Sequence, residues 1–327
     1  MARKYDESDA KIRPARSTRP RSKDRPSHEN AIRGFVIQVD RGRTSCVTET
    51  GVLVSAMKAR ELGKNSVVVG DHVALVGDTS GSEGSLSRIV SVYERKNSLT
   101  RTVDDAGALE RMIVSNVDQM IIVIAAANPE PRSGLVDRCL VVAFDQGIEP
   151  IILITKSDLA DASDFLKPYI NLGVQTLQRK RGDDLAPIKE LLRDKTSVLI
   201  GHSGVGKSTL VNALLDTDAR AVGDVNDVTG RGRHTSSSAV ALKLPNLDNQ
   251  TNSGWIIDTP GVRSFGLRHV DRDRVIGSFS DFADVINKCA KNCSHDEIGC
   301  ELEIWIGSDS ARMERVKSLR GMLNSNE

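Results

Sequence analysis

Aromatic residues are scarce in this chain of 327 residues: Phe, Tyr and Trp make up only 3% of it. Because stacking on bases requires aromatic side chains, we expect any contact with nucleic acid to depend mainly on phosphates and to weaken steeply with salt. Long apolar runs are also missing. The longest, Met120 to Ala127, is far shorter than the roughly 20 residues of a membrane-spanning helix, so no membrane partner is expected.

The N-terminus has no apolar run of the kind that follows the basic start of a signal peptide, so we expect a cytoplasmic, reducing location. Cysteines are few: the chain has five, and three of them fall between Cys289 and Cys300. Such clustering favours a metal site over disulfides. Cys46 and Cys139 lie in separate apolar stretches and are interpreted as small buried hydrophobic residues.

Although the net charge of the chain is only +1, one stretch is strongly basic: residues 11–25 contain seven Lys or Arg and one Asp. Without apolar residues to offset chain entropy, residues 1–30 are predicted to be a disordered basic arm. This arm is either a solvated tail without a partner or an RNA contact. The remaining length is enough for two or three domains.

Short strand-like runs separated by Gly, Ser, Asp and basic turns fill residues 31–95. Such spacing predicts a small OB-type β-barrel, with an SH3-like barrel as the alternative. Both kinds of barrel commonly bind nucleic acid, although fold alone does not establish function. The runs are GFVIQVD, TSCVTET, GVLVSAM, SVVVGDHVALV and SRIVSVY.

Residues 96–117 are predicted to be a linker, and from residue 118 the pattern changes to alternating strands and helices. This alternation predicts a mainly parallel sheet with helices on both faces over residues 118–270. Residues 271–327 are polar and helical, with the cysteine cluster in their middle. Predicted strands are MIIVIAA, PIILIT, GVQTL, TSVLI and the run before Asp258; predicted helices are 135–146, 185–193, 208–215 and 311–323.

Three motifs occur in an unusual order: TKSD (Thr155–Asp158), then GHSGVGKS (Gly201–Ser208), then DTPG (Asp258–Gly261). In an ordinary guanine-nucleotide-binding domain the phosphate loop comes first, the DxxG turn second and the base-reading [NT]KxD last. New chain termini placed in exposed loops leave the core contacts intact, so such a rearrangement of the motif order is physically allowed. The order therefore indicates a circularly permuted P-loop GTPase domain.

The glycine-rich motif has the composition of a phosphate loop between a strand and a helix. Its glycines let backbone N–H groups surround phosphate oxygens, Lys207 adds positive charge, and the Ser208 hydroxyl ligates magnesium. The predicted nucleotide-binding residues here are Gly201, His202, Ser203, Gly204, Val205, Gly206, Lys207, Ser208 and Thr209.

The other two motifs indicate guanine recognition and γ-phosphate sensing. The Asp158 carboxylate would accept hydrogen bonds from the guanine edge, Lys156 would pack over the base, and adenine would leave that carboxylate unpaired. Asp258 would hold magnesium through water, and the Gly261 amide would approach the γ-phosphate. Thr155 and Ser157 complete the first motif, and Gln175–Thr176 are a weaker candidate for the loop that backs the base.

VTGRGRHTSSS, residues 228–238, has the composition of a switch loop, in which Thr235 or Ser236 would give magnesium a second hydroxyl. Val262 occupies the position where many GTPases carry the glutamine that orients water. His234 can accept or donate a hydrogen bond near neutral pH and is our candidate catalytic residue for positioning that water. The alternative is that His234 helps the neighbouring arginines contact RNA phosphate.

Cys289, Cys293, His295 and Cys300 lie within twelve residues. Three thiols and one imidazole suffice for a closed tetrahedral zinc site with no open position for catalysis. We therefore predict one structural zinc ion per chain, which would help a short segment to hold its shape.

Together these residues resemble the RsgA family of small-ribosomal-subunit-dependent GTPases: a barrel, then TKSD, GHSGVGKS, GRGRHTSS and DTPGVRSFGL, then the Cys/Cys/His/Cys segment. The resemblance implies a late maturation factor that binds the 30S subunit and its 16S rRNA, hydrolyses GTP to GDP with magnesium when stimulated by the subunit, and then leaves. It also implies a catalytic role for His234 and favours Ser236 as the magnesium ligand. A monomer is expected.

Two other functions remain compatible with the sequence. In the first, a GTP-gated scaffold, hydrolysis would be negligible because Val262 cannot orient water. Nucleotide exchange alone would then control when the protein binds its partner. In a P-loop kinase or ATPase, TKSD would have no purpose. Phosphate release from GTP and ATP separates these alternatives.

Overall fold

The structure is a computed structural model. In it the chain forms two compact units, Met1–Asn30 and Ala31–Glu327. Only residues 28–30 of the first unit are described, so the predicted basic arm lies almost wholly outside the described residues. Within the described part of the chain, no helix is both long and apolar enough to cross a membrane. The described residues are 28–40, 42–63, 66–102, 110–216, 239–245, 254–259, 270–291, 293–297 and 299–324.

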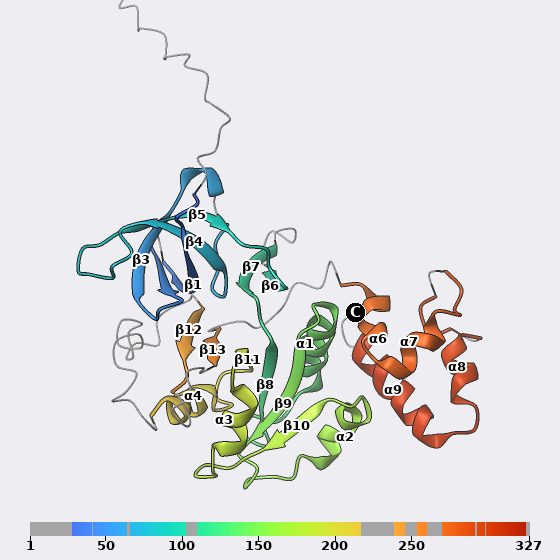
Figure 1. Ribbon diagram of the computed structural model, residues 1–327. Coiled ribbons are helices and arrows are strands. Elements are labelled where there is room, and N and C mark those ends of the chain that lie inside the picture. The colour runs from blue at the N-terminus through green and yellow to red at the C-terminus, as the bar shows by residue number, and fades with distance from the viewer. Residues whose placement is uncertain are drawn as a thin grey trace, which may run out of the picture. The chain divides into compact units, whose positions relative to one another are not determined.

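Five strands near the start of the second unit form a closed barrel, as the sequence predicts (Figure 1). Neighbouring strands follow the ring order β1-β2-β3-β5-β4-β1, in which only the β3–β5 pair is parallel. This ring is that of an OB-type barrel, and a short 3-10 helix, Arg60–Leu62, follows β3. The strands are β1 (Ile32–Val39), β2 (Thr44–Thr48), β3 (Leu53–Lys58), β4 (His72–Gly77) and β5 (Ser87–Val92).

The run of residues 66–76 is not one strand, which corrects the sequence-based prediction. The chain turns at Gly70, whose φ is +91° and whose missing Cβ would lie 2.1 Å from the Ser115 carbonyl oxygen. Before the turn, Val69 forms an isolated bridge with Val114. Only glycine combines this backbone conformation with this close approach, so β4 begins after the turn, at His72.

The predicted linker of residues 96–117 contains a two-stranded antiparallel sheet, β6 (Ser98–Thr102) and β7 (Glu110–Ser115). Leu99 and Val114, on these two strands, are fully buried in the main core. Burial of these apolar side chains explains why the segment forms strands instead of a plain connection.

Next comes the predicted parallel sheet, with strand order β10-β9-β8-β11-β13. β12 adds to its edge antiparallel to β13, and pairs in turn with β1 of the barrel at Gln38 and Val240. The barrel and the parallel sheet are therefore hydrogen-bonded to each other. The strands are β8 (Gln119–Ala125), β9 (Glu149–Thr155), β10 (Gln175–Gln178), β11 (Thr196–Ile200), β12 (Val240–Lys243) and β13 (Trp255–Asp258).

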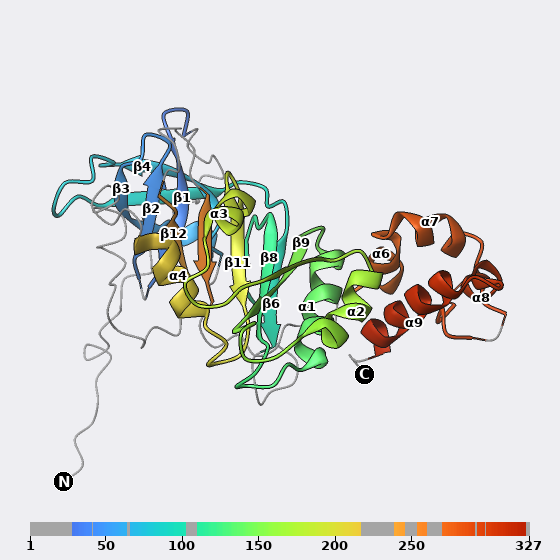
Figure 2. The ribbon, with the colours of Figure 1, turned by 90° about the horizontal axis from the view of Figure 1, so that it is seen from below.

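Helices cover both faces of this sheet, as predicted (Figure 2). Alternate residues of β8 explain this arrangement: Ile122 and Ile124 belong to one buried cluster, with α1 and α2, while Ile121 and Val123 belong to another, with α3 and α4. The helices are α1 (Ser133–Asp145), α2 (Ser163–Asn171), α3 (Ala186–Leu192) and α4 (Lys207–Asp216).

Residues 271–324 are mostly helical and contact α1 and α2. Phe279 packs on Phe144 of α1, with ring centroids 4.6 Å apart, and Arg315 donates hydrogen bonds both to Asp281 and to the Asn171 carbonyl at the end of α2. Phe282 and Trp305 extend the same apolar core. The helices are α6 (Arg272–Gly277), α7 (Ser280–Ile286), α8 (Glu301–Ile306) and α9 (Ser310–Asn324).

Candidate functional site

The three sequence motifs meet at one edge of the parallel sheet. Strand register places Ala125 beside Thr155, Ile122 beside Ile200, and Leu199 beside Asp258. Parallel strands end at a common edge, so the start of TKSD at the end of β9, the phosphate loop after β11 and the start of DTPG at the end of β13 converge there although they are far apart in the sequence. Such an edge is the usual ligand site of an open α/β sheet.

Glycine is required in the phosphate loop for two different reasons. At Gly201 a Cβ would lie 2.3 Å from the Val123 carbonyl oxygen, so a side chain would clash with β8. At Gly206 the φ of +95° is a conformation that other residues rarely adopt. The loop therefore leaves β11 tightly and reaches the first turn of α4 with its backbone N–H groups available to an anion.

Lys207 lies across this loop. Its ammonium group donates hydrogen bonds to the carbonyl oxygens of Gly201 and His202, the second at 2.9 Å. Burial lowers the pKa of Lys207, and the negative charge of Asp258 acts in the opposite direction. A partly desolvated ammonium held by two neutral carbonyls is well suited to interact with a phosphate oxygen.

Thr155 joins TKSD to the phosphate loop. Its hydroxyl donates to the Val205 carbonyl at 2.6 Å and lies 3.2 Å from the Ile124 carbonyl, and the residue is 7% exposed. Thr155 stands where asparagine is commoner in this motif, and here its shorter side chain makes a direct bond to the loop. The base-reading and phosphate-binding segments are thus held together by a buried hydrogen bond.

The rest of TKSD is held by backbone groups that the sequence did not reveal. The Lys156 ammonium donates to the Asn128 carbonyl in the loop after β8, and the Ser157 N–H donates to the Arg179 carbonyl at 3.2 Å. Asp158 is exposed. Its exposed side chain is therefore accessible to a base edge.

Gln175 and Thr176 do not back this motif, which corrects the weaker sequence-based candidate. They pair with Ile151 and Ile152, near the middle of β9 and three to four residues before Thr155. The prediction was wrong because β10 begins at Gln175 and runs parallel to β9. Arg179, which follows β10, is the residue next to TKSD.

DTPG is anchored by a residue that sequence reasoning missed. The Thr259 hydroxyl donates to the Leu199 carbonyl at 3.1 Å, and Thr259 is 4% exposed. This bond ties the start of the turn to β11, next to the phosphate loop. A hydroxyl residue after the aspartate was the only available signal, and it could not be interpreted without the strand register.

Four predicted site residues lie outside the described residues. They are the candidate catalytic residue His234, the two candidate magnesium ligands Thr235 and Ser236, and Gly261 of the DxxG turn. Their roles stay predictions.

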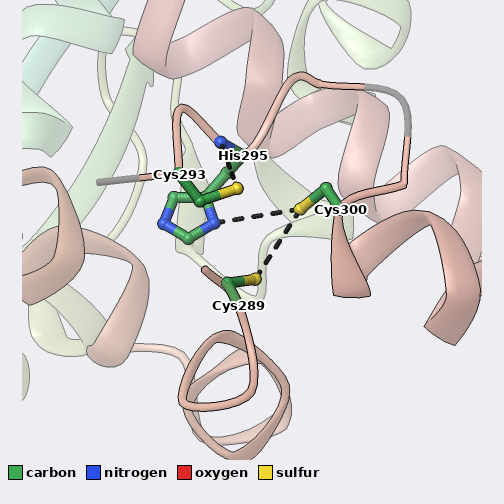
Figure 3. Close-up of side chains that lie close together, drawn as sticks. All are labelled: Cys289, Cys293, His295 and Cys300. Carbon is green, nitrogen blue, oxygen red and sulfur yellow. Dashed lines mark hydrogen bonds between the residues drawn. The ribbon is translucent and has the colours of Figure 1, made fainter. Parts of the chain in front are cut away.

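The predicted metal ligands come together in the C-terminal segment (Figure 3). One ligand atom from each of Cys289, Cys293, His295 and Cys300 lies within 4.8 Å of all the others. The Sγ atoms of Cys289 and Cys300 are 3.8 Å apart. Two thiolates on a tetrahedral zinc ion are also about 3.8 Å apart, since each Zn–S bond is about 2.3 Å long. The cluster therefore fits a tetrahedral metal ion.

His295 and Cys300 show how the protein shapes this cluster. His295 directs Nδ1 toward the Cys300 sulfur at 3.9 Å, and its Nε2 lies 3.1 Å from an Asp273 carboxylate oxygen. Burial raises the pKa of the Cys300 thiol to about 12. A bound cation would favour the thiolate form, which is the form that ligates metals.

Arg320 of α9 closes the loop that carries these ligands. It donates to the His295 carbonyl at 3.0 Å and pairs with Asp296 and with Glu303 of α8. By contrast Cys46 and Cys139 are fully buried away from the cluster, as predicted, and burial raises the pKa of both thiols. Three of the five cysteines are therefore placed for metal binding and two for packing.

Comparisons with known proteins agree with this geometry. A family model described as RsgA GTPase matches residues 92–268. Small ribosomal subunit biogenesis GTPase RsgA of Ectopseudomonas mendocina is 37% identical over 270 residues, which cover 80% of this chain and 75% of that protein. The protein of the same name from Shewanella oneidensis is 36% identical over 290 residues, covering 85% of this chain and 79% of that protein.

Solved structures extend the match to the fold. YjeQ from Thermotoga maritima is 26% identical with a TM-score of 0.63, and the alignment covers 90% of this chain and 99% of that one. YloQ, described as a circularly permuted GTPase, has a TM-score of 0.61 at 23% identity over 92% of this chain and 98% of that one. The predicted permuted fold is confirmed.

Proposed function

Because the chain belongs to the RsgA GTPase family and is therefore a GTP-hydrolysing enzyme, we propose that it acts in late maturation of the small (30S) ribosomal subunit. In this proposal it binds 16S rRNA in the GTP state, is stimulated by the subunit and is released after hydrolysis. The observation that carries the proposal is the convergence of TKSD, the phosphate loop and DTPG on one sheet edge. Family membership also favours hydrolysis over the GTP-gated scaffold.

Each motif has a role in this reaction. Asp158 would accept hydrogen bonds from the guanine N1 and N2 edge, while the Lys156 stem packs over the base. The loop from Gly201 to Thr209 would surround the phosphates, with Lys207 exchanging its carbonyl partners for β- and γ-phosphate oxygens. The buried Thr155–Val205 hydrogen bond supports this role because it fixes the distance between base and phosphate sites.

Magnesium would neutralise charge on the phosphates during transfer. Its protein ligands would be the hydroxyls of Ser208 and Ser236, with Asp258 acting through water. Ser208 lies in the first turn of α4, and Asp258 ends the neighbouring strand β13, which supports this part of the proposal.

His234 would position the attacking water, because Val262 has no hydrogen-bonding group. Replacing His234 by alanine should lower subunit-stimulated turnover by about 100-fold or more, the usual contribution of such a group. GTP affinity should stay unchanged, since His234 is outside the base and phosphate motifs. Phosphate release and GTP titration on the same preparation measure both quantities. Normal GTP affinity with undiminished stimulated turnover would exclude the catalytic role of His234.

The barrel and the zinc segment would be the two arms that contact rRNA, and the protein would act as a cytoplasmic monomer. One zinc ion held by Cys289, Cys293, His295 and Cys300 would stabilise the second arm. The closed OB-type ring and the fit of the four ligand atoms to a tetrahedral ion support these assignments.

Cosedimentation with purified ribosomal particles tests the proposal. With a non-hydrolysable GTP analogue the protein should pellet with small subunits and not with large ones, and GDP should release it. Since phosphate contacts dominate, affinity should fall steeply with salt. A protein that neutralises several phosphates loses orders of magnitude in affinity when the salt concentration rises from about 50 to 200 mM. Binding that ignores nucleotide and salt would contradict the proposal.

A further inference from the structure

Both ring nitrogens of His295, one of the four ligands of the metal cluster, face specific groups. Nδ1 lies 3.9 Å from the Cys300 sulfur, on the side where the three thiols gather. Nε2 points away from the sulfurs and lies 3.1 Å from Oδ1 of Asp273. The imidazole is 4% exposed, so it has few alternative orientations.

Asp273 comes from a different element than the ligands. It lies in the first turn of α6, 22 residues before His295, whereas the four ligands come from residues 289–300. Its side chain takes no part in capping the helix, because the α6 cap is the Asp271 carboxylate, which accepts from the backbone N–H groups of Asp273 and Arg274. The Asp273 carboxylate is therefore available to the imidazole.

We propose that Asp273 is a positioning residue for the metal cluster: it accepts a hydrogen bond from Nε2–H of His295 and so presents Nδ1 to the metal. This inference rests on the proposed zinc site and names a residue outside the ligand set. A neutral imidazole has one protonated nitrogen, and an acceptor at Nε2 fixes that proton there and leaves the Nδ1 lone pair for the metal. A carboxylate in this position also makes the ligand nitrogen more basic.

The same contact joins the metal loop to the nucleotide domain through α6. At its start the backbone N–H of Asp271 donates to Asp145 of α1 at 3.2 Å, and Arg274 pairs with that same buried carboxylate at 3.1 Å. α6 thus contacts α1 through Asp271 and Arg274, and the metal ligand through Asp273. It is also the first described helix after the DTPG motif.

The exposure of Asp273 limits how much its replacement should weaken zinc binding. The Asp273 side chain is 75% exposed, so water can replace part of its hydrogen bond when it is removed. Loss of such a partner typically lowers metal affinity by about 10–100-fold. We expect Asp273→Ala to lie near the lower end, about tenfold, and Asp273→Asn to lie between that and the wild type because its amide oxygen still accepts a hydrogen bond.

The test uses the full-length chain in wild-type, Asp273→Ala and Asp273→Asn forms. Zinc affinity is measured by competition with a chromophoric chelator. The matched control is Asp284→Ala, which removes an exposed carboxylate from α7 in the same segment and should leave zinc affinity unchanged. NMR of protein labelled with ¹⁵N-histidine supplies a second readout: the Nε2–H proton of His295 should be slow to exchange in the wild type and fast in Asp273→Ala.

The outcomes are distinguishable. Weaker zinc binding with faster Nε2–H exchange in Asp273→Ala, and an intermediate Asp273→Asn, supports the proposal. Wild-type affinity and wild-type exchange in Asp273→Ala overturn it, as does NMR evidence that the metal binds Nε2. If the wild-type chain binds no zinc at all, the proposed zinc site itself is wrong.

Discussion

Asp158→Asn is expected to weaken GTP binding by at least about 100-fold. The carboxylate would accept two hydrogen bonds from guanine, each worth about 1.5–3 kcal/mol when one partner is charged. Asparagine offers one acceptor and places an amide N–H₂ group against the guanine donors. Xanthine carries a carbonyl in place of the guanine amino group, so the variant should bind xanthosine triphosphate better than the wild type does.

Titration of both nucleotides against both proteins measures this exchange of preference. The matched control is Asp164→Asn, which removes an exposed carboxylate from the nearby helix α2 and should leave GTP affinity unchanged. Because Asp158 is exposed, its replacement should not alter stability by more than about 0.5 kcal/mol, so an affinity change reports on the base site. Equal GTP affinity in Asp158→Asn and wild type would show that Asp158 does not read the base.

Cys300→Ala should remove the metal from the chain and open the helical segment around it. Cys300 is 4% exposed, precedes α8 as its N-cap residue, and its Sγ approaches both Cys289 and His295. Three ligands cannot close a tetrahedral structural site, and structural zinc contributes about 10–16 kcal/mol to the folding of small zinc domains. Hydrogen exchange over residues 271–324 should therefore accelerate strongly, while GTP affinity persists.

Metal analysis of protein purified without chelators gives the direct readout, with about one zinc ion per wild-type chain expected. Cys46→Ala is the matched control, because it removes an equally buried thiol from the barrel core and should keep the metal. Full zinc content in Cys300→Ala, or no zinc in the wild type, would contradict the assignment of these four residues as a structural site.

Local chemistry explains why so much of the site could be predicted from the sequence. Thr155–Asp158, Gly201–Ser208 and Cys289–Cys300 each place their functional groups within a dozen residues, so spacing and residue type together indicate the chemistry. The alternation of β-strand and helix patterns likewise predicts the parallel sheet, because each strand is paired with the helix that covers it.

Contacts between distant segments explain what could not be predicted. The turn that divides residues 66–76 depends on the close approach of Gly70 to the Ser115 carbonyl. The register of β10 on β9 places Arg179, and not Gln175, beside TKSD. The Asp273–His295 contact depends on where α6 packs. None of these has a signal at fixed sequence spacing, since each is set by tertiary packing or strand register.

The permuted motif order acquires a physical consequence in this structure. In the usual order DxxG is followed by more of the nucleotide domain, whereas here it is followed by α6, which contacts Asp145 of α1 and the metal ligand His295. On the other side, β12 pairs with β1 of the barrel, and Trp255 of β13 contacts Phe35 with ring centroids 5.0 Å apart. Both proposed rRNA-contacting arms are therefore joined to elements of the domain that carries TKSD, the phosphate loop and DTPG.

Multiple-turnover phosphate release, measured with GTP and ATP side by side and with small subunits, large subunits or no ribosomal particle, tests the central claim most directly. We predict slow GTP hydrolysis by the protein alone, strong stimulation by small subunits only, and no turnover of ATP. Equal turnover of ATP, or GTP hydrolysis that small subunits leave unchanged, would contradict the proposed function.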